Sequence, residues 1–357
     1  MDSRRIARRV RKNIRLVSAG GVKNDTELPL SNLKSILTAT NNFSENNKLG
    51  EGGFDPVYKG ILPENQEVAV KRLSKKSGQG QHEFMNELKL IAKLQHTNLA
   101  RLLGCCMEED ELILIYEYMP NRSLDKFLFD PIEKTKLDWD TRFRIIQGVA
   151  QGVLYIHKYS RLKIIHRDLK ASNVLLDGKI VEKINPKVSD FGMARIFDIN
   201  QIEANYHKVV GPYGYMSPEY VLYGHFSEKL DVFSFGVLVL QTISGKKNAS
   251  FYCCENPLTL AQWIWKLWKE GSGMEVIDAS VRETCRIHEA LRCIHVGLLC
   301  VQEVPADRPT MSSVIHIDEA ATLPPSKEPA FSLSSNSNSV ITTYSKNFVT
   351  VTLPEHR

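Results

Sequence analysis

The pattern of hydrophobic and polar residues divides the chain into a first part that is rich in strands and a second part that is mostly helical. Three strand-like runs, each bounded by Gly, Pro, Asn or charged residues, occupy 57–62, 67–73 and 111–119. Between the second and third runs, hydrophobic residues recur at helical spacing, namely Phe84, Leu88, Ile91 and Leu94. We therefore expect a small sheet with one helix from this part of the chain.

The rest of the chain is predicted to be mostly helical. Residues 139–157 place apolar side chains on one face, after an Asp-Trp-Asp start that suits an N-cap. Residues 229–243 are apolar nearly all round, which predicts a helix buried in the core, with Gly245 just past its end. Residues 16–45 predict a polar linker with one short helix. Residues 324–357, rich in Ser, Thr, Pro and Asn, predict a mobile tail.

The composition of the 357 residues, 43% hydrophobic and 24% charged, is that of a globular protein. The seven cysteines match no zinc-binding spacing, so we expect free thiols in a reducing compartment. The longest apolar run, 232–240, is too short to span a bilayer, and no signal peptide opens the chain. These features predict a soluble intracellular protein.

The positive charge of the chain is concentrated at its N-terminus. Residues 1–15 hold six Arg and one Lys against one Asp, while the net charge of the whole chain is only +5. The main domain is therefore nearly neutral, and the basic arm has two interpretations of equal weight. It can bind anionic lipid, or it can be a solvated basic tail. Nucleic-acid binding and organelle targeting are disfavoured.

The stretch LGEGGFDPVYKG (49–60) has the glycines of a phosphate-binding loop, because Gly50 and Gly52 let a phosphate come close to the backbone. In a dinucleotide-binding fold or a P-loop such glycines lead straight into a helix. Here they lead into two strand-like runs, which argues against both folds. A glycine-rich loop between strands, followed by Val-Ala-Val-Lys, is instead typical of the loop over the ATP phosphates in protein kinases.

Further motifs of the same chemistry follow in order along the chain. They supply Lys71, Glu87, Asp168, Asn173, Asp190 and Glu219. Phosphoryl transfer needs a cation on the phosphates, oxygen ligands for magnesium, and a carboxylate that accepts the proton of the substrate hydroxyl. Lys71, held by Glu87, suits the α- and β-phosphates. Asn173 and Asp190 suit the metal, and Asp168 suits the base. Each residue alone has an ordinary structural explanation, but the ordered set favours the catalytic one.

Residues 44–317 resemble a protein kinase domain, and more narrowly the intracellular part of plant receptor-like kinases of the cysteine-rich and S-locus groups. The matching stretches are ATNNFSENNKLGEGGF, EFMNELKLIAKLQHTNL, YEYMPNRSLDKFLFD, NPKVSDFGMARIF, VVGPYGYMSPEY, DVFSFGVLVL and ADRPTMSSV. The resemblance implies a bilobal α+β fold with a small antiparallel β-sheet lobe and a larger, mostly helical lobe. It predicts a juxtamembrane-like arm and linker (1–43), an N-lobe (44–119), a C-lobe (120–317) and a flexible tail (318–357).

The resemblance also implies roles for further residues. It assigns ATP binding to Gly50, Gly52, Val57, Ala69, Lys71, Glu117 and Met119. It places Tyr116 as a guard of the pocket behind adenine. Asp231 is implied as the anchor of the catalytic loop, and Arg308 as the partner of Glu219. Lys170, in RDLKASN, resembles the serine/threonine-specific class.

Regulation by phosphorylation is implied by Arg167, which precedes the catalytic aspartate. A buried arginine at this point favours an anionic partner, and a phosphate supplies one. Between Phe191 and Ser217 the only hydroxyl-bearing residues are tyrosines. Relatives usually have threonine where Tyr206 stands, so Tyr206 is the candidate acceptor.

The lack of Ser and Thr between Phe191 and Ser217 is one of four departures from the family pattern, and the other three lie at Asp55, Pro212 and residues 178–184. Asp55 replaces the third glycine of the loop, which predicts weaker ATP binding unless the carboxylate points outward. Pro212 replaces a threonine whose hydroxyl bonds the catalytic Asp and Lys in relatives. Residues 178–184 lengthen a predicted hairpin tip, and Gln241, where relatives commonly have Glu, is a minor change.

The sequence thus predicts a protein kinase that uses ATP and Mg²⁺ to phosphorylate Ser and Thr hydroxyls of proteins. The alternative is a weakly active or inactive kinase-fold scaffold, because of Asp55 and Pro212. Expected partners are protein substrates, other kinases in auto- or trans-phosphorylation, and an anionic membrane surface through residues 1–15, with no nucleic acid. The expected location is the cytoplasm, at the inner face of the plasma membrane.

Overall fold

The computed structural model describes most of the chain between residues 28 and 352. The described residues are 28–52, 55–73, 78–108, 111–178, 184–197, 204–205, 208–212, 214–248, 259–316, 323–330, 341–345 and 348–352. Residues 1–15 and Tyr206, for which the sequence made predictions, lie outside them. Backbone contacts divide the chain into two compact units, one of residues 1–95 and 100–119 and the other of residues 96–99 and 120–357.

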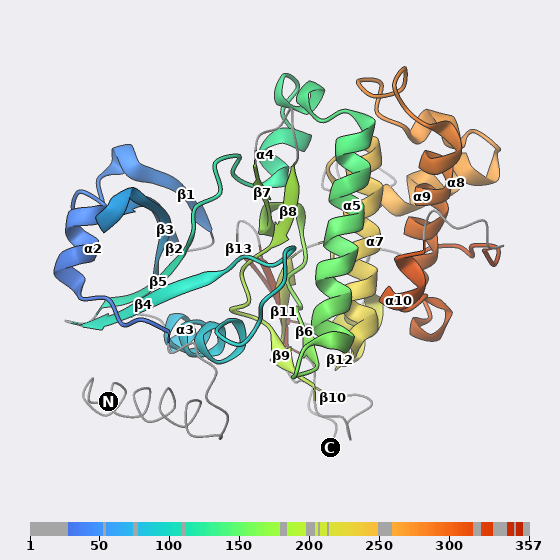
Figure 1. Ribbon diagram of the computed structural model, residues 1–357. Coiled ribbons are helices and arrows are strands. Elements are labelled where there is room, and N and C mark those ends of the chain that lie inside the picture. Colours follow the sequence, from blue (N-terminus) through green and yellow to red (C-terminus); the bar gives the residue numbers. More distant parts are fainter. Residues whose placement is uncertain are drawn as a thin grey trace. The chain divides into compact units, whose positions relative to one another are not determined.

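The first unit is built on a five-stranded antiparallel sheet (Figure 1). Its strands are β1 (Lys48–Gly52), β2 (Asp55–Leu62), β3 (Gln66–Leu73), β4 (Leu102–Glu108) and β5 (Glu111–Glu117), in the order β1-β2-β3-β5-β4. The three predicted runs form β2, β3 and β5. The sequence did not predict β1 or β4 as strands.

Two helices accompany this sheet, α2 (Leu33–Ala39) and α3 (Gly78–Ile91), together with the short helices η1 (Glu45–Asn47) and η2 (Pro63–Asn65). Asn32 caps α2 by accepting a hydrogen bond from the backbone of Ser35 at 2.7 Å. Leu33 and Ile36 of α2 pack in one cluster with Val68, Val70, Cys106, Ile113 and Ile115 of the sheet. The core of the first unit therefore includes a helix from the predicted linker.

The second unit contains the remaining elements. Its helices are α4 (Leu124–Leu128), α5 (Trp139–Leu154), α6 (Pro218–Tyr223), α7 (Glu228–Ser244), α8 (Leu260–Lys269), α9 (Ile287–Cys300) and α10 (Met311–Val314). Shorter ones are η3 (Glu133–Lys136), η4 (Tyr155–Tyr159), η5 (Ala171–Asn173), η7 (Gly273–Val276) and η8 (Pro305–Asp307). Its strands are β6 (Ile164–Ile165), β7 (Val174–Asp177), β8 (Asn185–Val188), β9 (Arg195–Ile196), β10 (Ala204–Asn205), β11 (Lys208–Pro212), β12 (His225–Phe226), β13 (Ile341–Ser345) and β14 (Phe348–Thr352).

Small antiparallel sheets link segments of the second unit. The pairs are β6 with β9, β7 with β8 and β10 with β12, and β14 lies between β11 and β13. In the β7–β8 hairpin Asp177 pairs with Asn185. Residues 179–183 of the predicted insertion lie outside the described part of the chain.

Helix α7 forms the centre of the second unit and confirms the prediction of a buried apolar helix. All of its residues from Leu230 to Ser244 are buried. Ser227 caps its start, and Gly245 ends it in the left-handed conformation at φ 63°. Helix α9 packs closely on it, because a Cβ atom at Gly236 would lie 2.6 Å from the Cβ of Cys300. Helix α5 runs beside α7 (Figure 1), and Asp138 caps it as predicted.

Residues 96–99 belong to the second unit because Asn98 binds to its hairpin. The Asn98 side-chain amide donates to Asn185 Oδ1 and to the carbonyl of Pro186, both at 3.0 Å. A Cβ atom on Gly152 of α5 would lie only 2.9 Å from the backbone oxygen of Asn98. Glycine at this position therefore lets the segment lie directly against α5.

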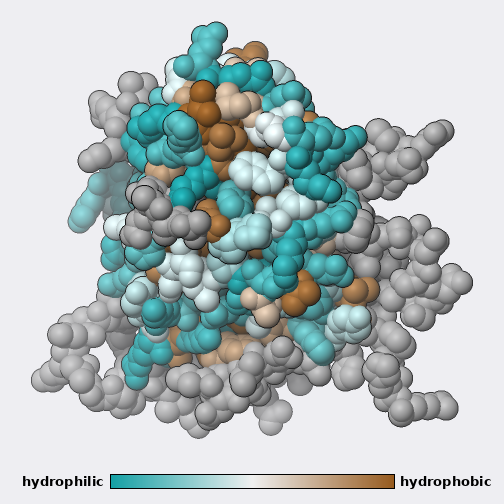
Figure 2. All heavy atoms as spheres, turned by 90° about the vertical axis from the view of Figure 1, so that its right-hand side faces the viewer, coloured by the Kyte–Doolittle hydropathy of each residue, from teal (hydrophilic) through white to brown (hydrophobic). Residues whose placement is uncertain are grey.

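The face of the second unit around α8 and α9 carries hydrophobic residues in small separate groups among hydrophilic ones (Figure 2). The tryptophans of α8 are half-buried, while Leu260, Ala261 and Ile264 are its buried residues. Lys246 lies over the ring of Trp263 at 5.3 Å, so this indole is covered by an aliphatic stem and a cation. Among the described residues, no helix is both long enough and apolar enough to cross a membrane.

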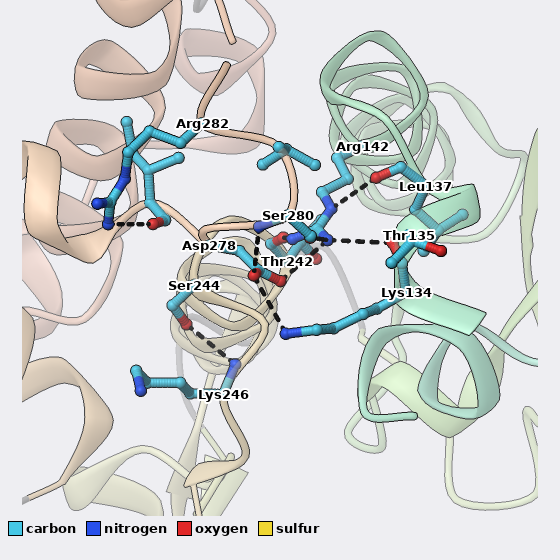
Figure 3. Close-up of polar contacts among 12 residues, drawn as sticks. Lys134, Thr135, Leu137, Arg142, Thr242, Ser244, Lys246, Asp278, Ser280 and Arg282 are labelled. Carbon is cyan, nitrogen blue, oxygen red and sulfur yellow. Dashed lines mark hydrogen bonds and ion pairs between the residues drawn. The ribbon is translucent and has the colours of Figure 1, made fainter. Parts of the chain in front are cut away.

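A buried ion pair joins α5 to the segment after η7 (Figure 3). Arg142 Nη2 donates to Asp278 Oδ2 at 3.0 Å, and the two side chains are 0% and 3% exposed. Backbone carbonyls accept the other guanidinium hydrogens, from Nε to Leu137 at 3.1 Å and from Nη1 to Thr242 at 3.0 Å. Lys134 reaches the second carboxylate oxygen at 3.2 Å from a partly exposed position. The Arg142–Asp278 pair therefore connects α5, the end of α7 and the segment after η7.

We predict that Arg142→Met lowers the free energy of unfolding by about 3–5 kcal/mol, because it leaves the Asp278 carboxylate buried without its main partner. Lys134→Met is the matched control, and it should cost under about 1 kcal/mol because Lys134 is partly exposed. Denaturant unfolding of both variants measures the difference. Equal losses for the two substitutions would contradict this assignment.

Candidate functional site

The first unit holds one group of the predicted site residues around Glu87. Lys71 Nζ in β3 lies 3.2 Å from Glu87 Oε1 in α3, so the ion pair expected from the sequence is present. The Glu87 side chain is 0% exposed. Tyr116 in β5 donates its hydroxyl proton to the other carboxylate oxygen, Oε2, at 2.5 Å. The carboxylate is thus fixed from two strands, and it orients the Lys71 ammonium.

The predicted nucleotide-binding residues lie on neighbouring strands of the sheet. Val57 is paired with Gly50 in β1 and with Lys71 in β3, so these three residues form one row across the sheet. Directly paired residues share a face of the sheet, as do residues two apart on a strand, which adds Ala69 to the same face. A Cβ atom on Gly50 would meet nothing within 4 Å. The space above the loop backbone is therefore open, as a phosphate group requires.

The two predicted hinge residues lie at the end of β5 and just after it. Glu117 is the last residue of β5, and its side chain accepts a hydrogen bond from the backbone of Arg101 at 2.8 Å. Its backbone N–H donates to the Arg101 carbonyl at 3.1 Å. Met119 is 6% exposed. The two hydrogen bonds to Arg101 therefore hold the backbone where it leaves the sheet after β5.

Asp55 is the first residue of β2, where it pairs with Gly52 of β1. Its side chain is only 7% exposed. The prediction left open whether the carboxylate points outward. Burial means that water and salt screen its charge less than they would at the surface.

The second unit holds the other group, on the loop between β6 and β7. The loop begins at His166 and Arg167, whose backbone N–H groups donate to Asp231 Oδ2 at 2.7 Å and Oδ1 at 2.9 Å. His157 Nε2 lies 2.8 Å from the same Oδ2 atom. Burial raises the pKa of Asp231, but His157 and the neighbouring donors outweigh it and hold that pKa below its usual value. The carboxylate therefore stays charged and anchors the loop to α7.

Asp168 receives hydrogen bonds on one side of its carboxylate only. Lys170 Nζ donates to Oδ2 at 3.0 Å, and Asn173 Nδ2 donates to the same atom at 2.9 Å. Oδ1 is buried and has no hydrogen-bond partner among the described residues. Burial raises the pKa of Asp168, and Lys170 opposes that increase. One fixed carboxylate oxygen thus keeps its hydrogen-bond-accepting capacity within the described part of the chain.

Asn173 and Asp190 are brought together through Ser189. The Ser189 backbone N–H and its hydroxyl both donate to the Asn173 carbonyl, at 2.9 and 3.0 Å. The Asn173 amide nitrogen also bonds Asp168, which leaves its amide oxygen for a cation. Asp190 adopts φ 64°, an unusual backbone conformation for a residue other than glycine that is typical of functional sites. An amide oxygen and a carboxylate are ligands that Mg²⁺ accepts.

The Arg167 side chain lies among the aromatic residues Tyr220 and Phe226. Its Nη2 donates to the Tyr220 hydroxyl at 2.5 Å, and its guanidinium lies 5.3 Å from the ring centre of Phe226. Phe226 belongs to β12, which pairs with Ala204 of β10. The predicted acceptor Tyr206 comes two residues after Ala204, outside the described residues.

One further predicted structural contact is present, and one contacting residue was missed by the sequence analysis. Arg308 donates to both carboxylate oxygens of Glu219 at 2.8 Å, as the sequence predicts. His157, which bonds Asp231, was not predicted. It lies at the end of the helical pattern 139–157, where a histidine looks like any other polar residue.

The comparisons with known proteins agree with this geometry. The family model described as protein tyrosine and serine/threonine kinase matches residues 43–317. A G-type lectin S-receptor-like serine/threonine-protein kinase of Arabidopsis thaliana is 57% identical over 307 residues, which cover 85% of this chain and 36% of the relative. Cysteine-rich receptor-like protein kinase 10 of the same plant is 56% identical over 298 residues, covering 83% of this chain and 44% of the relative. The chain therefore spans less than half the length of these relatives.

We predict that Asp231→Asn destabilises the second unit by about 3 kcal/mol, because the amide cannot accept hydrogen bonds on both sides from buried N–H donors. The pKa of Asp231 is lowered in the folded state, so its stabilisation is present above its unfolded pKa of about 3.9 and is lost as the pH falls through the folded value. The difference in unfolding free energy between wild type and variant should shrink below about pH 4. A difference that grows on acidification would contradict the assignment.

We predict that Tyr116→Phe costs about 1–3 kcal/mol of unfolding free energy, because the fully buried Glu87 carboxylate loses a donor. Tyr118→Phe is the control, since its ring lies against Lys59 rather than Glu87. Thermal or urea unfolding of the two variants gives the comparison. Indistinguishable stabilities would show that the Tyr116 hydroxyl does not hold Glu87.

Proposed function

Because the chain belongs to the protein tyrosine and serine/threonine kinase family, we propose that it transfers the γ-phosphate of ATP to Ser and Thr hydroxyls of other proteins. The observation that carries this proposal is the Asp168 carboxylate. Its Oδ2 atom accepts from Lys170 and Asn173, while the buried Oδ1 atom has no partner in the described part of the chain. Such an oxygen suits a group that orients a hydroxyl and takes its proton.

Each site residue then has a proposed task. Asp168 Oδ1 orients the substrate hydroxyl and accepts its proton as the new bond to phosphorus forms. Lys170, 3.0 Å from Asp168 Oδ2, supplies positive charge beside the reacting groups. Lys71, oriented by Glu87, binds the α- and β-phosphates under the Gly50–Gly52 loop. Mg²⁺, when bound by Asn173 and Asp190, would neutralise charge on the phosphates.

The serine/threonine specificity is proposed from Lys170, and the relatives' names support it. Pro212 argues against serine/threonine specificity, because proline lacks the hydroxyl that bonds the catalytic Asp and Lys in relatives. The Lys170–Asp168 bond nevertheless forms at 3.0 Å in this chain, in which residue 212 is proline. The bond between these two side chains thus forms without that hydroxyl.

The alternative function is that of a kinase-fold scaffold with little or no activity. Its main support is Asp55, whose buried carboxylate lies on the strand that follows the phosphate loop. A carboxylate about 6 Å from a phosphate at an effective dielectric near 20 costs about 3 kcal/mol per charge pair, before magnesium and solvent reduce it. This effect weakens ATP binding and need not abolish it.

Regulation and membrane binding are proposed for two further parts of the chain. A phosphate on Tyr206 would bring an anion toward Arg167, because β10 ends one residue before Tyr206 and pairs with β12 beside that guanidinium. The seven basic residues of 1–15 would bind anionic lipid headgroups at about 1 kcal/mol each near the surface. Both roles rest on charge complementarity.

The proposed activity predicts that the purified chain with Mg-ATP phosphorylates a protein substrate on Ser or Thr. Asp168→Asn should lower kcat by at least about 100-fold, because it removes the general base. Asp55→Gly should lower KM for ATP by about 10- to 100-fold if the carboxylate repels phosphate. Phosphoamino-acid analysis identifies the acceptor residue.

The controls separate the kinase from the scaffold. Transfer that persists in Asp168→Asn comes from a contaminant and counts against the proposal. No transfer by wild type, Asp55→Gly or Pro212→Thr, each folded by circular dichroism, would leave the scaffold. Recovery in one reverted variant would identify the substitution that lowered activity.

A further inference from the structure

The C-terminal part of the chain, for which the sequence predicted a flexible tail over 318–357, forms a β-hairpin on the strand that precedes α6. Strands β13 and β14 pair with each other along their whole length. The other edge of β14 pairs with β11 in an unbroken register, from Lys208 opposite Thr352 to Pro212 opposite Phe348. Strand β14 is therefore the middle strand of a three-stranded antiparallel sheet, which joins two segments far apart in the sequence (Figure 1).

Strand β11 lies against the loop that carries Asp168. A Cβ atom on Gly211 of β11 would lie 3.9 Å from the backbone oxygen of Arg167, the residue directly before Asp168. The same atom would lie 2.8 Å from Met216 Sδ, and Met216 packs on the hydrophobic cluster that contains Tyr220. The backbone of β11 is therefore held by the core beside the proposed catalytic base, and β14 takes one edge of this strand.

The contact between β11 and β14 is of the kind by which an extended peptide adds to the edge of a sheet. Such a peptide binds mainly through main-chain hydrogen bonds. The hairpin sequence ITTYSKNFVTVT suits this mode, because β-branched and aromatic residues predominate and it has no proline. Neighbouring strands lie about 4.8 Å apart, so β14 fills the space directly beside β11. A protein segment that approaches the Asp168 loop along this edge therefore meets β14.

The tail is also tied to the second unit ahead of the hairpin. The Gln302 side-chain amide donates to the carbonyl of Lys327 at 2.8 Å and accepts from its backbone N–H at 3.0 Å. The Ala330 N–H donates to the Val301 carbonyl at 3.2 Å. These bonds tether the tail at the end of α9. A tether raises the effective concentration of the segment that follows it, so the hairpin needs only weak affinity to pair with β11.

We propose that residues 341–352 are an autoinhibitory hairpin, which occupies the edge of β11 and keeps protein substrates from the Asp168 loop until it detaches. This inference rests on the proposed kinase function. The pairing suits release, because β11 spans only five residues and Pro212 offers no N–H at its end. The hairpin thus competes with protein substrates and not with ATP.

The test compares steady-state kinetics of the full chain with its Val349→Pro/Thr350→Pro double variant. Neighbouring residues of a middle strand donate to opposite sides, so the two prolines remove one donor toward β11 and one toward β13. If the hairpin is paired in about nine of ten molecules, its release lowers KM for a protein substrate about 10-fold, because only detached molecules bind the substrate. KM for ATP and kcat at saturating substrate should stay unchanged.

Asn336→Pro/Ser337→Pro is the matched control, because it places the same two substitutions in the tail ahead of β13. It should leave every kinetic constant unchanged. Amide hydrogen exchange at residues 209–211 is the second measurement, and it does not need activity. Exchange in this stretch should become faster in the hairpin variant, which loses the β14 ladder, and should stay at the wild-type rate in the control.

The outcomes separate this inference from the proposed function. Inactive wild type with an active hairpin variant would support autoinhibition strongly. Wild-type KM for the protein substrate in a variant with faster exchange at residues 209–211 would overturn it, and so would unchanged exchange there.

If both wild type and hairpin variant are inactive while exchange at residues 209–211 rises, the pairing stands, but the kinase function and the inhibition both fail. A uniform rise in exchange over the second unit would show that the hairpin stabilises the whole unit, and would also overturn the specific role.

Discussion

The burial of the Asp231 carboxylate in helix α7, whose residues Leu230–Ser244 are all buried, is the constraint on which the second unit depends. A charge in this position is unfavourable unless donors surround it. The backbone N–H groups of His166 and Arg167 and the ring of His157 supply those donors. These groups belong to the loop between β6 and β7 and to η4, which follows α5. The hydrogen bonds to this one carboxylate therefore also fix the loop that carries Asp168. The same hydrogen bonds therefore stabilise the core of the second unit and set the geometry of the candidate site.

The first unit solves the same problem with Glu87, which is 0% exposed and receives donors from Lys71 and Tyr116. In this unit the hydrogen-bonded Glu87 carboxylate orients the Lys71 side chain, whereas Asp231 orients a loop. Arg142 and Asp278 form a third buried pair, whose partners are backbone carbonyls and structural side chains. Comparing these three buried carboxylates shows that a buried ion pair is not by itself evidence of a catalytic site. What distinguishes Asp168 is an oxygen that its neighbours in the described chain leave without a hydrogen bond.

Sequence patterns predicted those helices and strands in which the spacing of hydrophobic residues matches the positions that are buried in the structure. Helix α7 is apolar nearly all round and has a capping glycine, so its bounds were predicted to within a residue at each end. Strand β4 was missed because LLGCCME has no alternation and contains a glycine. The candidate site residues were predicted from motifs of fixed order, and their catalytic roles stay predictions. The contacts of Gln241 and His157 could not be found, since their partners Tyr215 and Asp231 lie 26 and 74 positions away.

Two of the departures from the family pattern, Pro212 and Asp55, have different physical consequences. Pro212 removes a hydroxyl from a region with several other polar links, and the Lys170–Asp168 bond is formed without it. Such a loss can be compensated, because another group can hold the same backbone. Asp55 instead adds a buried charge beside a loop that is proposed to receive phosphates, and no rearrangement of hydrogen bonds removes a charge. The choice between an active kinase and a scaffold therefore depends more on one carboxylate in the first unit than on the residues that would carry out the chemistry in the second.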